Sequence, residues 1–446
     1  MVTLFNGLFE RKWTYLALFG GFFLIEVLLS PWTGHPYDME VWFNTGAWMN
    51  QGINIYEPSN HLGYPPLWAF WCLIAYRFYS FFGNSTEVWR FIIKLPLMIS
   101  HLALAYSVGK FATKEFGRKK GLEIFYIVLA WSFFIYIGAL WGQINTLSAL
   151  LTFLAFSAVV SQRTTLGALL FGIGVTLKIY PLIILPGLFA YVLKKHSKRE
   201  AGKFLLYTSA VPILFTLSIF TVFRWDIVFF LRTIFFWTPT FESPVQITRG
   251  CMNLWSFLAL FNVDMRAHWP LRHIWIVVLG AGASYWLKKS KLDKADLNLS
   301  LISLYILFMI SYGWVTEQTF VDPLPFIFLQ ILAYRPKRSH LYMLVAIQIL
   351  VYAFSAINGG VFIFEPLLER FSPALLSSIQ YLDLINSPFA WTIRGTLGLI
   401  ISLFLAVFLI ILAKPNTFNS LLSILPSRLK RSRTIEEFAD TKQMSV

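Results

Sequence analysis

Charged residues are scarce in this sequence. Only 13% of its 446 residues are Asp, Glu, Lys or Arg, whereas 57% are hydrophobic. A soluble domain would carry about twice that charged fraction. Apolar runs of about 20 residues recur along the chain, and each is long enough to cross a hydrocarbon core of ~30 Å. The runs are continuous rather than alternating, which excludes a transmembrane β-barrel. The sequence therefore predicts an all-α, polytopic membrane protein.

Cysteine and several catalytic signatures are also lacking. Cys72 and Cys251 are the only cysteines, so neither a disulfide framework nor a cysteine-based metal site is predicted. There is no Walker loop, no GxSxG elbow and no HExxH helix, which argues against the nucleotide, serine-hydrolase and zinc chemistries that those motifs carry. The first apolar run, residues 13–29, is too long for a signal-peptide core and has no small-residue cleavage site, so it is predicted to stay as a helix.

Basic residues dominate the charge that is present, because the net charge is +15. Most of them lie in short segments between apolar runs or near the chain ends: residues 11–12, 114–120, 194–203, 288–294, 335–338 and the tail after 414. By the positive-inside rule these segments face the cytoplasm. No soluble domain exists to carry a nucleic-acid patch, so contact with anionic lipid accounts for the charge and no nucleic-acid partner is predicted.

This charge pattern predicts about twelve transmembrane helices with both termini inside. The apolar run at 145–160 is one of these helices, and residues 166–193 are expected to form two short helices that meet at Lys178 near the outer face. Residues 67–82 are rich in Trp and Tyr and contain Arg77, as is typical of an interfacial helix. Residues 1–413 are predicted to be a single transmembrane domain, and 414–446 a basic, mobile cytoplasmic tail.

The first outer loop, residues 35–66, contains no Lys or Arg but carries Asp38, Glu40 and Glu57. The carboxylates of Asp38 and Glu40 could bind a divalent cation together, or one of them could act as a general base. An exposed acidic loop, or a cap on a following helix, is the alternative. In the same loop, the Gly63-Tyr64-Pro65-Pro66 turn either shapes a substrate site or simply ends the loop.

Two further outer-face groups are candidates. Lys178 lies inside an apolar run, where an ionisable residue is a functional candidate; its ammonium could pair with a lipid phosphate, or it could extend to the interface as an ordinary anchor. Glu317 and Gln318 lie in a polar turn before a proline-broken helix and could hydrogen-bond sugar hydroxyls. Arg249 belongs to the same face with a weaker signal.

Several short sequence marks follow one another in order along this topology. They are Tyr37-Asp38, the Gly52, Tyr56 and Tyr64-Pro65-Pro66 run, Lys94-Leu95-Pro96, Trp141-Gly142-Gln143-Ile144-Asn145, Gly172 with Lys178-Ile179-Tyr180-Pro181, and Glu317-Gln318 with Leu324-Pro325. In this order the sequence resembles the C-type superfamily of polytopic glycosyltransferases that use polyprenyl-phosphate sugars. It is most similar to mannosyltransferases of the family-87 and glycosylphosphatidylinositol types. Two positions depart from related enzymes: Thr316 stands where histidine is common, and His101 where aspartate is common.

The resemblance implies an enzyme with Asp38 as general base, a hexose donor that is mannose-bearing by analogy, and a glycan or glycolipid acceptor on the non-cytoplasmic face. Attack opposite the lipid phosphate would invert the anomeric configuration. The expected substrate-binding residues are Glu40, Tyr64, Gln143, Asn145, Lys178, Tyr180, Arg249, Glu317 and Gln318. No cofactor or metal is expected, since a lipid phosphate leaves readily, although a cation between Asp38 and Glu40 stays open. The membrane, endoplasmic reticulum or plasma membrane, depends on the organism, and an accessory subunit is an open question.

The main rival is a polytopic transporter or lipid flippase, which twelve spans and broken helices would also fit. A transporter would place its site at the membrane midplane and would usually show two related halves. Here the polar groups are predicted to face one side, and no repeat is evident. A second rival, an oligosaccharide polymerase or ligase, would have arginines rather than a carboxylate in its outer loops. The one-sided polar groups, the lack of a repeat and the carboxylate in the first outer loop all favour the transferase.

Overall fold

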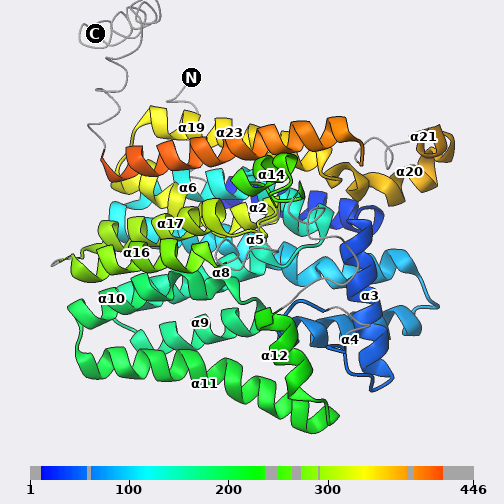
Figure 1. The fold of residues 1–446 in the computed structure, drawn as a ribbon, viewed down its shortest axis with the longest axis horizontal. Coiled ribbons are helices and arrows are strands. Elements are labelled where there is room, and N and C mark those ends of the chain that lie inside the picture. Colours follow the sequence, from blue (N-terminus) through cyan, green and yellow to red (C-terminus); the bar gives the residue numbers. More distant parts are fainter. Residues whose placement is uncertain are drawn as a thin grey trace, which may run out of the picture.

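We describe the fold from a computed structural model, which covers residues 12–57, 62–236, 249–263, 273–289, 292–378 and 386–414. These residues form helices and connecting segments and contain no strand, which confirms the predicted all-α class. Most of the longer helices lie side by side with their axes roughly aligned, and α3 (Pro36–Asn50) crosses their ends (Figure 1). The predicted tail, residues 415–446, lies outside the described part of the chain.

Five described helices are long and apolar enough to cross a membrane. They are α5 (Thr86–Phe116), α11 (Lys198–Phe223), α17 (Lys294–Ser311), α19 (Arg338–Ile357) and α23 (Pro388–Ala413). The number rises to seven if two bent pairs each count as one span. One pair joins α2 (Lys12–Leu29) to α3 with a bend of 80°, and the other joins α6 (Arg118–Ala130) to the segment 132–141 with a bend of 43°. The multi-pass architecture is therefore supported, and the count of twelve spans stays a prediction.

Three shorter apolar helices complete the bundle. They are α8 (Asn145–Val160), α9 (Thr164–Leu177) and α16 (Ile274–Lys288). Helix α8 begins and ends where the sequence predicted. Helix α9 ends just before Lys178, and a 3₁₀ turn (Tyr180–Ile184) leads into α10 (Leu185–Lys195). Pro181 has no N–H to give to the carbonyl four residues earlier, so the α-helix cannot continue through it. Lys178 thus lies at a helix break, as predicted, where its side chain can contact neighbouring elements.

The first outer segment is predicted to carry interfacial helices, but the sequence pattern sets bounds only for the one at 67–82 and describes residues 35–66 as a loop. Residues 36–50 form α3, which begins with proline at its first position, where a missing N–H costs nothing. Helix α4 (Pro66–Phe81) follows at the place predicted for an interfacial helix. The two helices pack closely, because Gly46 of α3 lies against the backbone of Cys72, where a Cβ would clash. Asp38 and Glu40 are therefore held on a helix rather than on a loop, whereas Glu57 lies after the helix.

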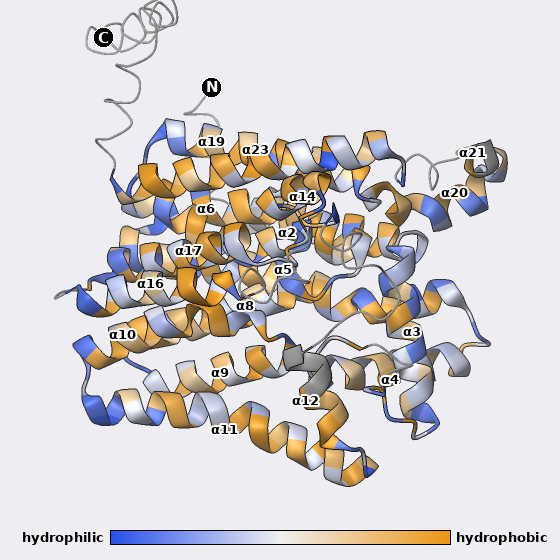
Figure 2. Ribbon diagram, in the orientation of Figure 1, coloured by the Kyte–Doolittle hydropathy of each residue, from blue (hydrophilic) through white to orange (hydrophobic). Residues whose placement is uncertain are grey.

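The basic segments gather at one end of the bundle. Lys294 pairs with Glu115 at 2.6 Å, Lys194 donates to the carbonyl of Lys289, and Arg335 donates to the carbonyl of Leu412 at 2.6 Å. Hydrophilic residues mark this end and hydrophobic residues fill the middle of the parallel helices (Figure 2). Helix α3 lies at the opposite end. The basic charge is therefore distributed asymmetrically along the bundle, as the positive-inside rule predicts for a membrane protein.

Candidate active site

Asp38 lies in the first turn of α3, where the helix dipole favours a negative charge. The indole N–H of Trp141 donates a hydrogen bond of 2.6 Å to its Oδ2. The Nδ1 of His35 lies 3.5 Å from the same oxygen, and the Asp38 side chain is 13% exposed. Within the described part of the chain, Oδ1 accepts no hydrogen bond. One oxygen is therefore anchored and the other is left able to accept a proton.

The group that anchors Asp38 is itself built from distant segments. The His35 and Trp141 rings stack with centroids 4.5 Å apart and an interplanar angle of 5°. The backbone N–H of His35 donates to the Trp141 carbonyl at 3.1 Å. Trp141 ends a π-helical turn (Tyr136–Trp141), a distortion that occurs often at functional sites. Burial lowers the pKa of His35, and the Asp38 carboxylate opposes that shift.

Lys94 connects the segments that flank the Asp38 site. Its buried ammonium donates to the carbonyls of Ser30, Thr33 and Leu140 at 2.9, 2.6 and 3.2 Å, and to the Thr33 hydroxyl. It thereby ties the end of the first helix to the residue before Trp141. The lysine has no need of an anionic ligand, because carbonyl oxygens already surround its charge. Its role is structural, as is that of His101, which pairs with the buried Glu26 of α2.

Lys178 is 5% exposed at the break after α9. Its ammonium donates to Asn145 Oδ1 at 2.9 Å and lies over the rings of Tyr180 and Tyr64, at 4.6 and 5.5 Å from their centroids. Burial lowers its pKa to about 8, while the charges of Asp322 and Asp38 act in the opposite direction. Within the described residues the ammonium makes one hydrogen bond, so donors remain for an anionic ligand.

Asn145 links Lys178 to the carboxylate of Asp322. Its Nδ2 donates to Asp322 Oδ2 at 2.8 Å, and Asp322 is fully buried. Burial raises the pKa of Asp322 to about 6, and Lys178 and the Asn145 hydrogen bond lower it. The result is a buried Lys178–Asn145–Asp322 chain. A fixed amide keeps the two charges apart while a negative charge still supports the ammonium.

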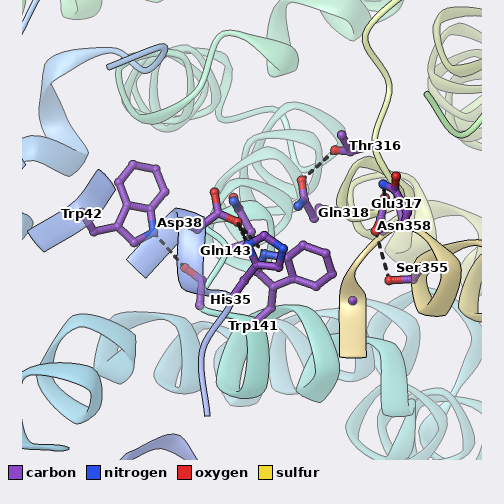
Figure 3. A network of polar contacts seen from close by, with 12 residues as sticks. His35, Asp38, Trp42, Trp141, Gln143, Thr316, Glu317, Gln318, Ser355 and Asn358 are labelled. Atoms are coloured by element: carbon purple, nitrogen blue, oxygen red, sulfur yellow. Dashed lines mark hydrogen bonds and ion pairs between the residues drawn. The ribbon is translucent and has the colours of Figure 1, made fainter. Parts of the chain in front are cut away.

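Glu317 forms a second carboxylate group near Asp38. Its oxygens accept from Ser355 at 3.0 Å and from Asn358 at 3.4 Å, and Asn358 in turn accepts from Arg394. Burial raises the pKa of Glu317 to about 7, and the charge of Asp38 adds to that rise. In the view of Figure 3, Gln318 lies between the group around Asp38 and Gln143 and the group around Glu317.

Tyr64 and Gln143 close the side of the site next to Lys178. The Tyr64 hydroxyl donates to Gln143 Oε1 at 3.3 Å, and the Trp42 indole donates to the carbonyl of Gly142 at the same distance. Burial raises the pKa of Tyr64, and the Asp38 charge raises it further. Asp38 therefore acts electrostatically on Lys178, Glu317 and Tyr64, which come from three separate regions of the chain.

Two expected substrate-binding residues lie elsewhere. Glu40 is exposed and lines a different groove from Asp38, because residues two apart on a helix are rotated by about 200° and point to nearly opposite sides. In this conformation the two carboxylates do not share one cation. Arg249 stacks on Trp391 of α23, with 4.0 Å to the ring centroid. The described residues also contain no group of three His, Cys, Asp or Glu side chains that could hold a metal ion.

Comparison with known proteins identifies the family of the chain. The family described as glycosyltransferase family 87 matches residues 63–311, more than half of the chain. The chain belongs to glycosyltransferase family 87. The match includes Tyr64, Gln143, Asn145, Lys178 and Tyr180, whereas Asp38 and Glu317 lie outside it. The search of curated proteins found no match. The family-87 protein is thus a glycosyltransferase, and its apolar helices make it a multi-pass membrane protein.

Three residues that the structure places in the candidate site were not singled out from the sequence. His35 and Trp141 hold Asp38, and Asp322 supports Lys178. Trp141 and Asp322 lie within motifs that the sequence analysis quoted, so a polar or aromatic residue in such a motif was the available signal. His35 precedes a proline three residues before Asp38, and nothing in its local pattern separates it from an ordinary turn residue.

Proposed function

We propose that this protein transfers a hexose, mannose by resemblance, from a polyprenyl-phosphate sugar to a hydroxyl of a glycan or glycolipid, on the membrane face opposite the basic segments. The observation that supports this most is a series of contacts between an anchored carboxylate and a buried ammonium: Trp141 donates to Asp38, the nearby Gln143 accepts from Tyr64, and the Lys178 ammonium lies over the Tyr64 ring. A base and a phosphate partner are the two groups that such a transfer needs. The endoplasmic reticulum or the plasma membrane would be the location, according to the organism.

In this mechanism Asp38 Oδ1 removes the proton from the acceptor hydroxyl as the hydroxyl oxygen attacks the anomeric carbon. A base positioned in this way contributes about 10²–10⁴-fold to a rate. Trp141 fixes the carboxylate through Oδ2, so the side chain keeps its orientation and needs no reorganisation. The bond from the anomeric carbon to the phosphate oxygen breaks on the opposite side, and the sugar is transferred with inverted configuration.

The leaving group is polyprenyl phosphate, whose negative charge grows as the bond breaks. The Lys178 ammonium is in place to stabilise that charge, and it is buried, where charge interactions are stronger than in water. Tyr64 and Tyr180 lie beside the ammonium and would confine the phosphate there. The hydrogen-bonding groups of Gln143, Gln318 and Glu317 would contact sugar hydroxyls. No metal takes part in this proposal.

The test is a transfer assay with radiolabelled polyprenyl-phosphate mannose, comparing wild-type protein with Asp38→Asn at matched expression and matched thermal stability. Loss of transfer by at least about 10²-fold would support Asp38 as the base. Asp296→Asn is the matched control, since Asp296 pairs with Lys289 at the opposite end of the bundle, and it should still transfer the sugar. Full activity of Asp38→Asn would exclude the base role, and wild-type protein that cleaves no lipid-phosphate sugar would exclude the proposed donor.

A further inference from the structure

A groove with charged and aromatic residues in its lining lies beside the site, and the mechanism above does not use it. It has a volume of about 350 Å³ and is bordered by the start of α3, the start of α5 and α20 (Glu365–Phe371). That volume is at the lower end of the range for small-molecule sites. Its lining includes Phe43, Trp89, Arg90, Glu365 and Glu369. It lies at the same end of the bundle as α3, away from the basic segments.

The charges around the groove restrict what can bind there. Glu40, Glu365 and Glu369 line it together with Arg90. An anion would meet three carboxylates and a metal cation would meet the guanidinium, so neither fits well. A neutral polyhydroxyl compound suits both groups, because its hydroxyls donate to carboxylates and accept from the guanidinium. The lining is otherwise largely apolar, with aromatic surfaces from Phe43 and Trp89 that could contact the apolar faces of a sugar ring.

Two of the groove's donors lack partners in the described part of the chain. Arg90, half-buried, forms no ion pair or hydrogen bond there, although Glu365 and Glu369 act on it through space. Trp89 is 4% exposed, and its indole N–H has no hydrogen-bond partner. Leaving a buried donor unpaired costs free energy, and such groups usually have a partner. A ligand oxygen in the groove would supply one.

The groove is also a direct neighbour of the catalytic carboxylate. Gly34, Pro36 and Met39 line it, and they flank His35 and Asp38 in the sequence. Pro36, Met39, Glu40 and Phe43 follow the helical spacing that places them on one face of α3, and Asp38 projects from the other side of the same helix. Met39 links the two sides, because it lies against Gly142, the residue after the Trp141 that anchors Asp38. Gly34 is pressed against the Met39 side chain, where a Cβ would clash, so this turn separates the two spaces by little more than one residue.

We propose that the groove between α3, α5 and α20 binds sugar residues of the acceptor, with Arg90 and Trp89 as hydrogen-bond donors and the glutamates as acceptors. The proposal rests on the proposed function, since it makes this groove the acceptor side of the same site. The sugar that receives the hexose would lie at Asp38, and the sugars behind it would occupy the groove.

The experiment uses octyl glycosides that carry one or three mannose residues as acceptor probes. Binding of the trimannoside to purified full-length protein is measured by calorimetry without donor, and the acceptor and donor KM values are measured by transfer. Trp89→Phe keeps the ring and removes the N–H, and Arg90→Gln removes the guanidinium. Loss of the neutral indole hydrogen bond in Trp89→Phe should weaken trimannoside binding and raise its KM about 3- to 10-fold, and loss of the charged donor in Arg90→Gln should have at least that effect. The donor KM should not change.

Arg370→Gln is the matched control, because Arg370 is also on α20 but its guanidinium lies over Trp32, outside the groove. It should bind the trimannoside as wild type does. If Trp89→Phe or Arg90→Gln does not fold, the exposed Glu369→Gln replaces it. Unchanged trimannoside binding in all groove variants, or a donor KM that rises equally, would overturn the proposal. Binding without any transfer would refute the proposed function alone, and transfer without binding would refute the groove alone.

Discussion

Replacing Asp322 by Asn removes a buried negative charge while keeping the shape of the side chain and its ability to accept from Asn145. Asp322 and the Lys178 ammonium are joined through one amide by hydrogen bonds of 2.8 and 2.9 Å. At a separation of about 6–8 Å and an effective dielectric constant of ~20, their attraction is ~2–3 kcal/mol. Asp322→Asn therefore favours loss of the Lys178 proton by a factor of about 30 to 100.

The sign of the effect on activity follows from the pKa of Lys178. Burial lowers that pKa to about 8 in the wild type, so about nine-tenths of the protein carries the ammonium at pH 7. In Asp322→Asn most molecules would lose it at that pH. The donor kcat/KM of the wild type should fall as the pH rises through about 8, whereas the variant should already be low at pH 7 and should recover towards pH 5.5.

The assay measures donor kcat/KM from pH 5.5 to 9 with polyprenyl-phosphate mannose, in wild type and Asp322→Asn. Asp296→Asn is the matched control, because Asp296 pairs with Lys289 at the basic end of the bundle and its loss should leave the pH profile unchanged. Identical profiles for wild type and Asp322→Asn would refute the argument that Asp322 keeps Lys178 charged. A uniform loss of activity at every pH would point to a structural role instead.

Two further predictions concern the carboxylates of the site. Trp141→Phe keeps the stacked ring but removes the donor to Asp38; hydrogen bonds to charged groups contribute ~1.5–3 kcal/mol, so kcat should fall about 10- to 100-fold. Trp131→Phe, which loses a 3.2 Å bond to the neutral Gln348, should retain activity, and equal kcat values in the two variants would contradict the prediction. Glu317 has its pKa raised to about 7 by burial, so its contribution to stability is present below its ordinary pKa and is lost as the pH rises through about 7. Glu317→Gln should therefore unfold at a higher temperature than wild type at pH 8 but not at pH 5, and equal melting temperatures at pH 8 would contradict this.

The helical membrane architecture was predictable because it depends on local composition. Helix α8 matches the apolar run at 145–160, and the break after α9 follows from Pro181. Each feature is encoded within one continuous stretch of the sequence. Interfacial helices were expected in the first outer segment, but the bounds of α3 were not predicted, because its sequence mixes apolar and polar residues without a clear helical period. Its helicity depends on packing against α4 and on the proline that starts it.

The candidate site was only partly predictable. Asp38 and Lys178 stand out in the sequence because an acidic residue beside a membrane helix and a lysine within an apolar run are both unusual. Their partners do not stand out. Trp141 is 103 residues from Asp38, and Asp322 is 177 residues from Asn145. Contacts over such distances depend on how the helices pack, which no local pattern describes.

The sequence by itself determined the membrane class, the positions of most apolar helices and the segments that carry the basic charge, and it singled out Asp38 and Lys178 as candidates for chemistry. These follow from hydrophobicity, charge and proline, which act locally. Only the tertiary structure decided that Asp38 is anchored by Trp141, that Lys178 is supported by Asp322 and that Glu40 faces a separate groove. The physical reason is that hydrogen bonds and charge interactions depend on distance and direction in space, and these exist only after the helices have packed.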